Sequence, residues 1–155
     1  MGAMKVSLLL FAVSLIARAD APVTTLANFP NSMVYAVESD ASGNIYVGGF
    51  HGNFSKADPF VAKLSRGGKT LYSRTFGGNG FGMAWAIAVD SSGAAYVFGN
   101  TNAPDFPVTP GALQTILQTT SQGFVAKLDP NGEIVYSTFV GRIASWASCA
   151  SFLPL

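Results

Sequence analysis

Residues 60–77, FVAKLSRGGKTLYSRTFG, recur 64 positions further along the chain as FVAKLDPNGEIVYSTFVG at residues 124–141. A second stretch, YAVESDASGNIYVGGF at residues 35–50, recurs 50 positions later as WAIAVDSSGAAYVFGN at residues 85–100. The first pair is identical at 9 of 18 positions and the second at 7 of 16, well above chance. Self-similarity at such a spacing indicates a repeat architecture. The chain therefore contains two copies of one unit.

The repeats divide the chain into segments. We place the first repeat at residues 34–84 and the second at residues 85–141. Because the offset between the copies grows from 50 to 64, the second copy carries 14 extra residues, which we assign to an inserted loop at 101–122. A lead-in at residues 20–33 precedes the repeats. The tail at residues 142–155 does not continue their pattern.

Each unit predicts four strands joined by hairpin turns, and hence an all-β fold. The first turn is Asp40-Ala41-Ser42-Gly43 in one copy and Asp90-Ser91-Ser92-Gly93 in the other. In such turns Asp accepts hydrogen bonds from the backbone ahead of it, and Gly supplies a positive φ. Gly49 and Gly99 follow β-prone residues, and we expect them to end or bulge their strands.

The third strand of the unit predicts how the sheets pack. Phe60, Ala62 and Leu64 should share one face, with Val61 and the aliphatic part of Lys63 on the other. A four-stranded unit with two apolar faces needs neighbours, and such units stack radially as propeller blades. Because closed propellers have about four to eight blades, two four-stranded blade units indicate an incomplete propeller.

The inserted loop predicts a short helical turn over Pro110 to Leu117. Thr109 would act as its N-cap and Pro110 as its first helical residue. We expect the apolar Phe106 and Leu113 of this loop to pack onto their own blade.

The first 19 residues predict a helical, cleavable signal peptide. Lys5 provides a positive start, Val6 to Ile16 an apolar run, and Ala17-Arg18-Ala19 an A-x-A cleavage site before Asp20. The run is shorter than the ~20 apolar residues of a bilayer span, so we expect no stable membrane span. The predicted location is secreted, periplasmic or cell surface.

Charge and cysteine content exclude several partners. The net charge is +1 and the basic residues are scattered, which does not favour nucleic acid binding. Cys149 is the single cysteine, so no intramolecular disulfide forms and no cysteine-based metal site is predicted. We assign Cys149 no role and expect no cofactor.

Few residues are candidates for chemistry, and we predict no catalytic and no metal-binding residue. His51 is the single histidine, and we interpret it as a solvated side chain in the loop after the second strand. Asp40 and Asp90 are explained by turn bonding, and Tyr35 and Trp85 by packing between blades. Residues 77–82 are glycine-rich but lack the Lys and helix of a phosphate loop, so they are interpreted as the connection between blades.

Three motifs in order carry a family resemblance. IAVDSSGAAYVFGNT, DFPVTPGALQT and GFVAKLDPNGEIVYSTFVG resemble the SBBP repeat, a bacterial beta-propeller repeat named for seven blades. The resemblance covers essentially all of residues 35–141. It implies a propeller in exported or cell-surface proteins, and it implies no catalytic residues.

The favoured function is a non-catalytic exported binding or cell-surface module with an unknown extracellular or periplasmic ligand. One alternative is a truncated fragment of a larger propeller protein, because RIASWASCASFLPL at residues 142–155 departs from the repeat. Another is a propeller enzyme with a site in its central channel. Self-association of several chains could also complete a propeller.

Overall fold

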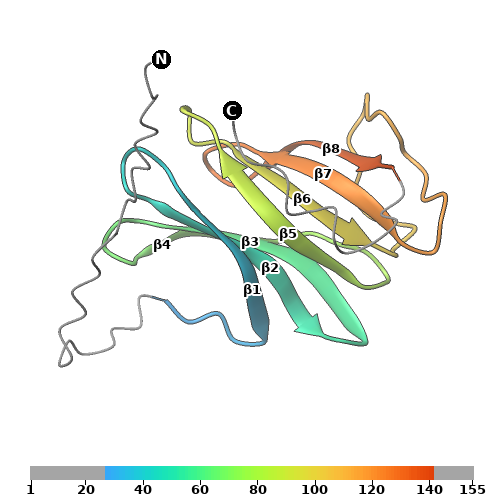
Figure 1. Ribbon diagram of the computed structural model, residues 1–155, viewed down its shortest axis with the longest axis horizontal. Helices are drawn as coiled ribbons and strands as arrows, with labels where there is room; N and C mark the ends of the chain where they lie inside the picture. The colour runs from blue at the N-terminus through green and yellow to red at the C-terminus, as the bar shows by residue number, and fades with distance from the viewer. Residues whose placement is uncertain (1–26, 142–155) are drawn as a thin grey trace, which may run out of the picture.

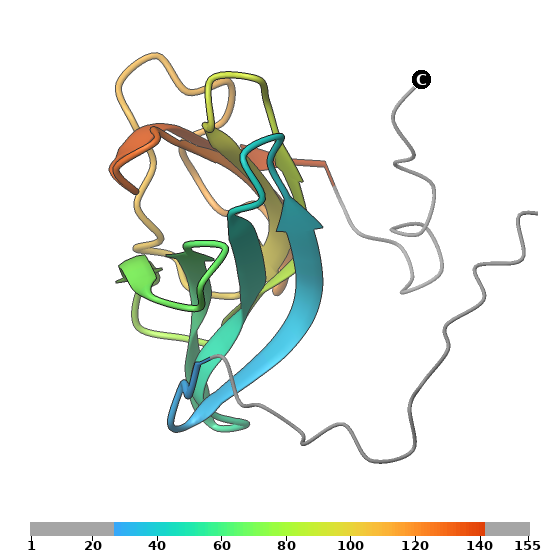
Figure 2. The ribbon, with the colours of Figure 1, turned by 90° about the vertical axis from the view of Figure 1, so that its left-hand side faces the viewer.

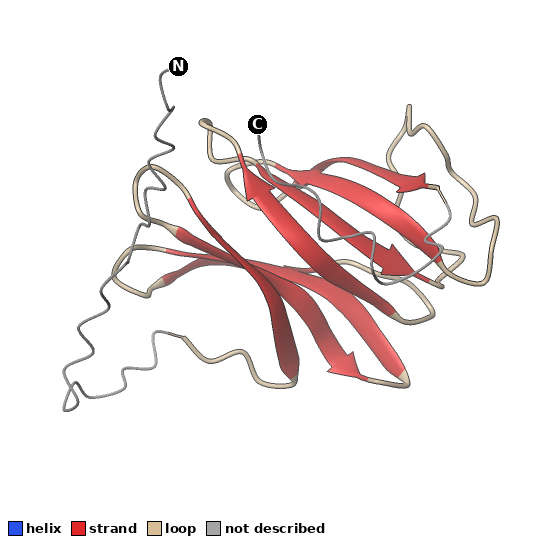
Figure 3. Ribbon diagram, viewed as in Figure 1, coloured by secondary structure: helices blue, strands red, loops and turns tan. Residues whose placement is uncertain are grey.

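The computed structural model describes residues 27–141, so the predicted signal peptide and the off-pattern tail lie outside the described residues. The described chain has eight strands and no helix (Figures 1 and 3). The strands are β1 (Ser32–Ser39), β2 (Ile45–Asn53), β3 (Lys56–Leu64), β4 (Thr70–Thr75), β5 (Gly82–Val89), β6 (Ala95–Thr101), β7 (Gln122–Leu128) and β8 (Ile134–Val140). They form two antiparallel four-stranded sheets, β1 to β4 and β5 to β8, each in chain order. The prediction of an all-β fold with four strands per unit is confirmed.

The two sheets stack face to face, with β5 lying against β1, β2 and β3. Figure 2 shows them after a quarter turn, the first sheet in blue to green and the second in yellow to red. One core cluster spans both sheets and joins Tyr46 and Val61 of the first to Val97, Phe124 and Leu128 of the second. Burying an apolar side chain of this size contributes roughly 1.5–3 kcal/mol, so the sheets depend on each other for stability.

Each sheet has two distinct faces, which the strand registers define. In the first sheet, the covered face carries Tyr46, Val61, Lys63 and Tyr72, and the second sheet packs on it. The outer face of the first sheet carries Val47, Phe60, Ala62 and Leu64, which form a separate cluster with Ala27 and Phe29. The predicted alternation along residues 60–64 is confirmed.

The second sheet repeats this division. It packs Phe124, Ala126 and Leu128 against the first sheet. Its outer face carries the residues that align with the covered face of the first sheet, namely Tyr96, Val125, Lys127 and Tyr136. The two sheets are therefore stacked in the same sense, one unit following the other.

Gly49 and Gly99 do not end or bulge their strands, so that prediction is wrong. β2 and β6 continue through them, and the extra residue lies on the neighbouring strand, at Tyr35 in β1 and Trp85 in β5. The bulge brings the partner backbone close, so a Cβ on Gly49 would clash with the carbonyl of Met33. Glycine is required there by close approach of a neighbouring strand.

The predicted helical turn over residues 110–117 is also wrong, because the inserted loop bonds to the sheet instead. The Thr109 N–H donates to the Ser137 carbonyl (3.1 Å), and the Phe139 N–H donates to the Gln114 carbonyl (3.1 Å). Thr109 Oγ1 accepts from the Ser137 N–H (3.0 Å) rather than capping a helix. The loop therefore satisfies backbone groups of β8, which would otherwise be an open sheet edge.

The two apolar loop residues that were expected to pack, Phe106 and Leu113, differ in burial. Phe106 is 3% exposed and packs in the core, as predicted. Leu113 is 83% exposed, so its predicted packing is wrong. The backbone bonds of Gln114 to β8 fix the loop on the sheet edge without burying its neighbour.

Candidate functional site

The carboxylates of the repeated aspartates accept hydrogen bonds within their own turns, as predicted. Asp40 Oδ1 accepts from the N–H groups of Ser42 (3.0 Å) and Asn44 (2.9 Å). Asp90 Oδ1 makes the same contacts with Ser92 (2.9 Å) and Ala94 (3.1 Å). Gly43 and Gly93 close these turns with φ values of 78° and 82°. Hydrogen-bond donors directed at a carboxylate stabilise its charged form. The carboxylates of Asp40 and Asp90 therefore have a structural role in their turns.

Asp90 gives the turns a measurable pH dependence. The Ser92 hydroxyl donates to Asp90 Oδ1 (2.6 Å) and, with the backbone donors, lowers the pKa of Asp90 from 3.8 to about 2. A depressed folded-state pKa stabilises the protein above the unfolded value, and this stabilisation is lost as pH falls from about 4 toward 2.

We therefore expect Asp90→Asn to reduce the decrease in stability at acidic pH, because Asn can accept the turn hydrogen bonds but does not titrate. Urea denaturation midpoints at pH 5 and pH 2.5 check this, and the difference between them should be smaller in the variant than in the parent. Asp40 and Asp129, whose pKa values are also lowered, leave a residual slope. An unchanged difference would contradict the assignment.

A cluster of Asp, Tyr and Lys recurs at equivalent positions of the two sheets. Lys63 Nζ lies 3.9 Å from Asp40 Oδ2 and 4.9 Å from the centroid of the Tyr46 ring. In the second sheet, Lys127 Nζ lies 3.9 Å from Asp90 Oδ2 and 4.7 Å from the Tyr96 ring. Each ammonium thus lies over an aromatic ring and near a carboxylate, which allows it to stay near apolar surface.

The two clusters differ in exposure because the second sheet covers only the first of them. Tyr46 is fully buried and its hydroxyl donates to the Gly93 carbonyl (3.1 Å) of the second sheet or to Asp40 Oδ2 (3.2 Å). Burial raises the pKa of Tyr46 to about 12. Tyr96, its counterpart, is 38% exposed and donates to Asp90 Oδ2 (3.2 Å).

This difference predicts unequal effects of removing one hydroxyl. Tyr46→Phe should lower the free energy of unfolding by about 1 kcal/mol, because it leaves the buried Gly93 carbonyl without its side-chain donor. Tyr96→Phe, the matched variant on the open face, should change it by less than about 0.5 kcal/mol. Chemical denaturation of both variants checks the order. Equal effects would contradict a buried contact between the sheets.

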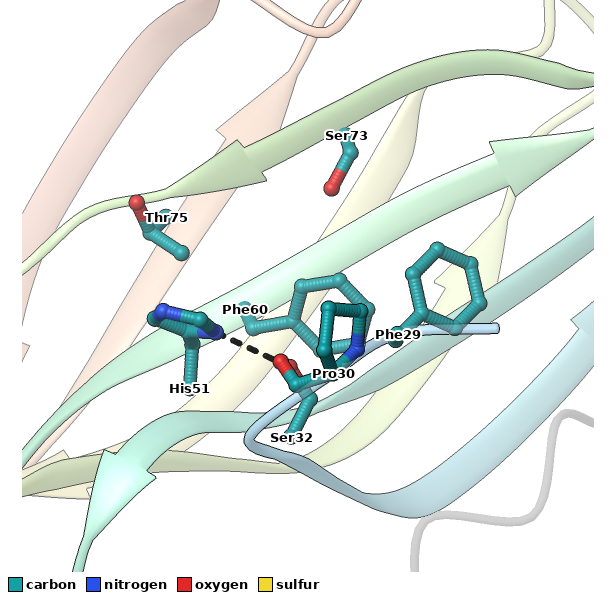
Figure 4. Close-up of a pocket in the computed structure, with 7 residues that line it drawn as sticks. All are labelled: Phe29, Pro30, Ser32, His51, Phe60, Ser73 and Thr75. Atoms are coloured by element: carbon teal, nitrogen blue, oxygen red, sulfur yellow. Dashed lines mark hydrogen bonds between the residues drawn. The ribbon is translucent and has the colours of Figure 1, made fainter. Parts of the chain in front are cut away.

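A pocket of about 220 Å³ lies on the outer face of the first sheet (Figure 4). Phe29 and Phe60 form its apolar wall, with ring centroids 5.0 Å apart. Its lining is completed by Pro30, Ser32, His51, Ser73 and Thr75. The lining contains no Asp, Glu, Lys or Arg, so it suits an uncharged or apolar group.

The equivalent position of the second sheet is filled. Phe106 from the inserted loop lies 4.6 Å from the Phe124 ring and 5.7 Å from the Phe139 ring. The first sheet lacks the 14-residue insertion, and Thr75 stands where the second sheet has Phe139. The pocket is therefore an unfilled place on a sheet face, which three-dimensional packing reveals and the sequence did not predict.

His51 lies within β2 and not in the loop after it, so that part of the prediction is wrong. Its Nδ1 is 3.0 Å from Ser32 Oγ, which also lies within 3.3 Å of the Pro30 carbonyl (Figure 4). Asp58 is opposite His51 in the register of β2 and β3. Within residues 27–141, however, no carboxylate is hydrogen-bonded to His51. Ser32 and His51 are therefore not joined there by the acidic partner of a serine-hydrolase triad.

The glycine-rich segment connects the two sheets, as predicted, and is held by side chains of the inserted loop. Asp105 accepts from the Asn79 backbone N–H and its side-chain amide (both 2.7 Å). Asn102 Oδ1 accepts from the Phe81 N–H (2.6 Å). A Cβ on Gly78 would clash with Asp105, so glycine here permits close approach of a carboxylate.

In the part of the chain that the structure describes, no group of three His, Cys, Asp or Glu side chains is arranged to bind a metal ion.

Tyr35 and Trp85, the two bulge residues, pack on each other across the sheets with ring centroids 5.2 Å apart. Trp85 Nε1 also donates to Asn100 Oδ1 (2.8 Å). The prediction that they pack between the units is confirmed.

Within residues 27–141, no helix has the length and apolar content to cross a membrane. A scan against models of protein families and a search of curated proteins found no match to this chain.

Proposed function

We propose that this chain is a non-catalytic module of propeller-type repeats, resembling the SBBP repeat, that is exported and acts by binding. The observation that carries the proposal is the stacking of two equivalent sheets in the same sense. Phe124, Ala126 and Leu128 of the second sheet cover the face of the first that holds Tyr46 and Lys63. Radial stacking of consecutive four-stranded sheets is the building rule of a propeller.

The polar side chains support a structural use of the repeats. Asp40, Asp90 and Asp129 serve turns, and the lysines lie over tyrosine rings. A central-channel enzyme would need polar groups that differ between blades and converge on one point. The same groups recur here at equivalent positions, which favours binding through sheet faces and loops over catalysis.

Export rests on the sequence of residues 1–20. If a bacterial host exports the chain, the intact mass of the product should correspond to residues 20–155. Ala19→Arg should block cleavage and leave the full-length mass, because small residues are required at that position. Retention of the uncleaved parent chain in the cytoplasm would contradict the export part of the proposal.

The propeller-type part is tested by adding a third repeat. A second copy of residues 77–141 placed after Gly141 should fold onto the outer face of the second sheet, because that face aligns with the one already covered. In repeat proteins each added neighbour contributes an interface term, so the denaturation midpoint should rise and the transition should stay cooperative.

A matched control carries Phe→Asp in the added copy at the position equivalent to Phe124, which removes the apolar contact and should abolish the gain. An added repeat that stays unfolded, with the original chain unchanged, would contradict a propeller-type repeat.

A further inference from the structure

The lead-in covers part of the outer face of the first sheet and leaves the pocket beside Phe60 open. Ala27 and Phe29 pack on the apolar cluster of this face. Phe60, which is 2% exposed, and the half-buried Phe29 form the apolar wall of the pocket. In the second sheet the inserted loop places Phe106 at the equivalent position. The first repeat therefore keeps open a space that the second repeat fills with an aromatic ring.

Two hydroxyl groups of β4 line the pocket beside this apolar wall. Thr75 of β4 lies opposite Phe60 of β3, and Ser73 comes two residues earlier, so both side chains are on the outer face (Figure 4). Both residues are exposed. Within residues 27–141, neither hydroxyl is hydrogen-bonded to another residue. Each hydroxyl can therefore donate a hydrogen bond to a ligand and accept one from it.

His51 of β2 contributes a third polar group, and Ser32 determines which ring nitrogen carries the proton. The Ser32 hydroxyl donates to the Pro30 carbonyl (3.3 Å), so its oxygen accepts from His51 Nδ1 (3.0 Å). A neutral imidazole with its proton on Nδ1 has an acceptor at Nε2. The lining thus joins an apolar aromatic wall to three groups that form hydrogen bonds, with no Asp, Glu, Lys or Arg among them.

We propose that this pocket binds one ring of a neutral sugar. A sugar ring has an apolar C–H face and hydroxyls around its edge. The C–H groups carry partial positive charge, which the negative face of the Phe29 ring attracts. The sugar hydroxyls pair with Ser73, Thr75 and His51, whereas a purely apolar ligand would displace water from these groups without replacing its hydrogen bonds. The inference rests on the proposed binding function and deepens it by naming a site and a ligand class.

The volume of the pocket limits the ligand to a small one. At about 220 Å³, the pocket is smaller than the ~300–1,000 Å³ of sites that enclose drug-sized ligands. One sugar ring, either free or at the end of a saccharide chain, is a ligand of suitable size. Because one ring makes few contacts, we expect a dissociation constant on the order of 1 mM.

His51 provides the readout for a binding test because it is the single histidine of the chain. Its ring protons give the histidine signals in the NMR spectrum of the untagged, intact chain. These signals are followed at constant pH while methyl glycosides of glucose, galactose and mannose are added in separate titrations. We expect at least one glycoside to shift the His51 signals saturably, with a midpoint on the order of 1 mM.

Thr75→Phe is the decisive variant, because it gives the first repeat the residue that the second repeat has at Phe139. The added ring should fill the pocket and weaken sugar binding at least about tenfold. Thr70→Phe is the matched control, since Thr70 is an exposed residue of β4 that does not line the pocket. This control should bind like the parent chain. Circular dichroism checks that both variants are folded.

A saturable shift in the parent and in Thr70→Phe that is lost in Thr75→Phe would support the site. Titration with the free sugars distinguishes the two sources of the ring. Binding of a methyl glycoside supports the end of a saccharide chain, and binding of the free sugar alone supports a free sugar. The proposal is overturned if none of these compounds shifts the His51 signals, or if Thr75→Phe binds as tightly as the parent.

Failure of this inference is separable from failure of the proposed propeller-type stacking. If no sugar binds but an added third repeat folds onto the chain, the stacking stands and the sugar site is excluded. If a sugar binds at the pocket but the added repeat stays unfolded, the sugar site stands and the stacking is excluded.

Discussion

Replacing Gly99 with alanine is expected to lower the free energy of unfolding by about 3 kcal/mol or more, a large fraction of the ~5–15 kcal/mol that stabilises a typical domain. The Cβ would clash with the carbonyl oxygen of Met83 on the bulged strand β5 and with the ring of Phe124. Phe124 is fully buried between the sheets, and the Met83 carbonyl belongs to a paired strand. Neither can move without breaking backbone hydrogen bonds or core contacts.

Gly67→Ala is the matched control for Gly99→Ala. Gly67 lies in the turn between β3 and β4, and an added Cβ would meet only Ser65 Oγ at 3.9 Å. It should leave the denaturation midpoint nearly unchanged. Urea denaturation followed by circular dichroism gives both values, and a Gly99→Ala protein as stable as Gly67→Ala would contradict the close approach of β5.

Phe124→Ala is expected to cost about 3–5 kcal/mol, the range for removing a buried phenylalanine. The Phe124 ring contacts Phe76 from the first repeat and Phe106 from the inserted loop, with centroids 5.9 Å and 4.6 Å away. Its loss therefore leaves a cavity at the point where both sheets and the loop meet. The packing of the second sheet on the first sheet and on the loop should therefore weaken together.

Phe54→Ala provides the comparison for Phe124→Ala. Phe54 is 76% exposed, so its removal should cost less than about 0.5 kcal/mol although its ring touches Phe50. The free energies of unfolding of the two variants should differ by several kcal/mol. A similar cost for both would show that Phe124 is not at the centre of the core.

Much of the fold could be predicted because the repeats carry local signals. The Asp-x-Ser-Gly turns and the alternation along Phe60 to Leu64 depend on short-range chemistry, and both are confirmed. Packing of Tyr35 on Trp85 followed from the expectation that bulky repeat residues lie between units. These features need only neighbouring residues or the repeat itself.

Other features depended on long-range contacts. Thr109 and Pro110 have the chemistry of a helix start, but Thr109 is hydrogen-bonded to Ser137 on β8 instead of capping a helical turn. Gly99 was expected to end or bulge its own strand, whereas it accommodates a bulge on the neighbouring strand β5. His51 was placed in the loop after the second strand, which was expected to end or bulge at Gly49, yet pairing with β3 extends the strand to Asn53.

The candidate site was less accessible to sequence reasoning than the fold. The pocket beside Phe60 exists because the first repeat lacks Phe106 and has Thr75 in place of Phe139. The repeat alignment contained both differences, but only the packed sheets show that they leave one shared space. The unequal burial of Lys63 and Lys127 likewise follows from which face the second sheet covers.

The stacking order is tested most directly by amine labelling of Lys63 and Lys127, read out by mass spectrometry at a dilution where the chain is monomeric. Their side chains are 10% and 35% exposed, although they occupy the same position of the repeat. The account predicts slow labelling of Lys63 and faster labelling of Lys127, with Lys127 becoming protected once a third repeat is added. Equal labelling of the two, or faster labelling of Lys63, would contradict the stacking of the second sheet on the first.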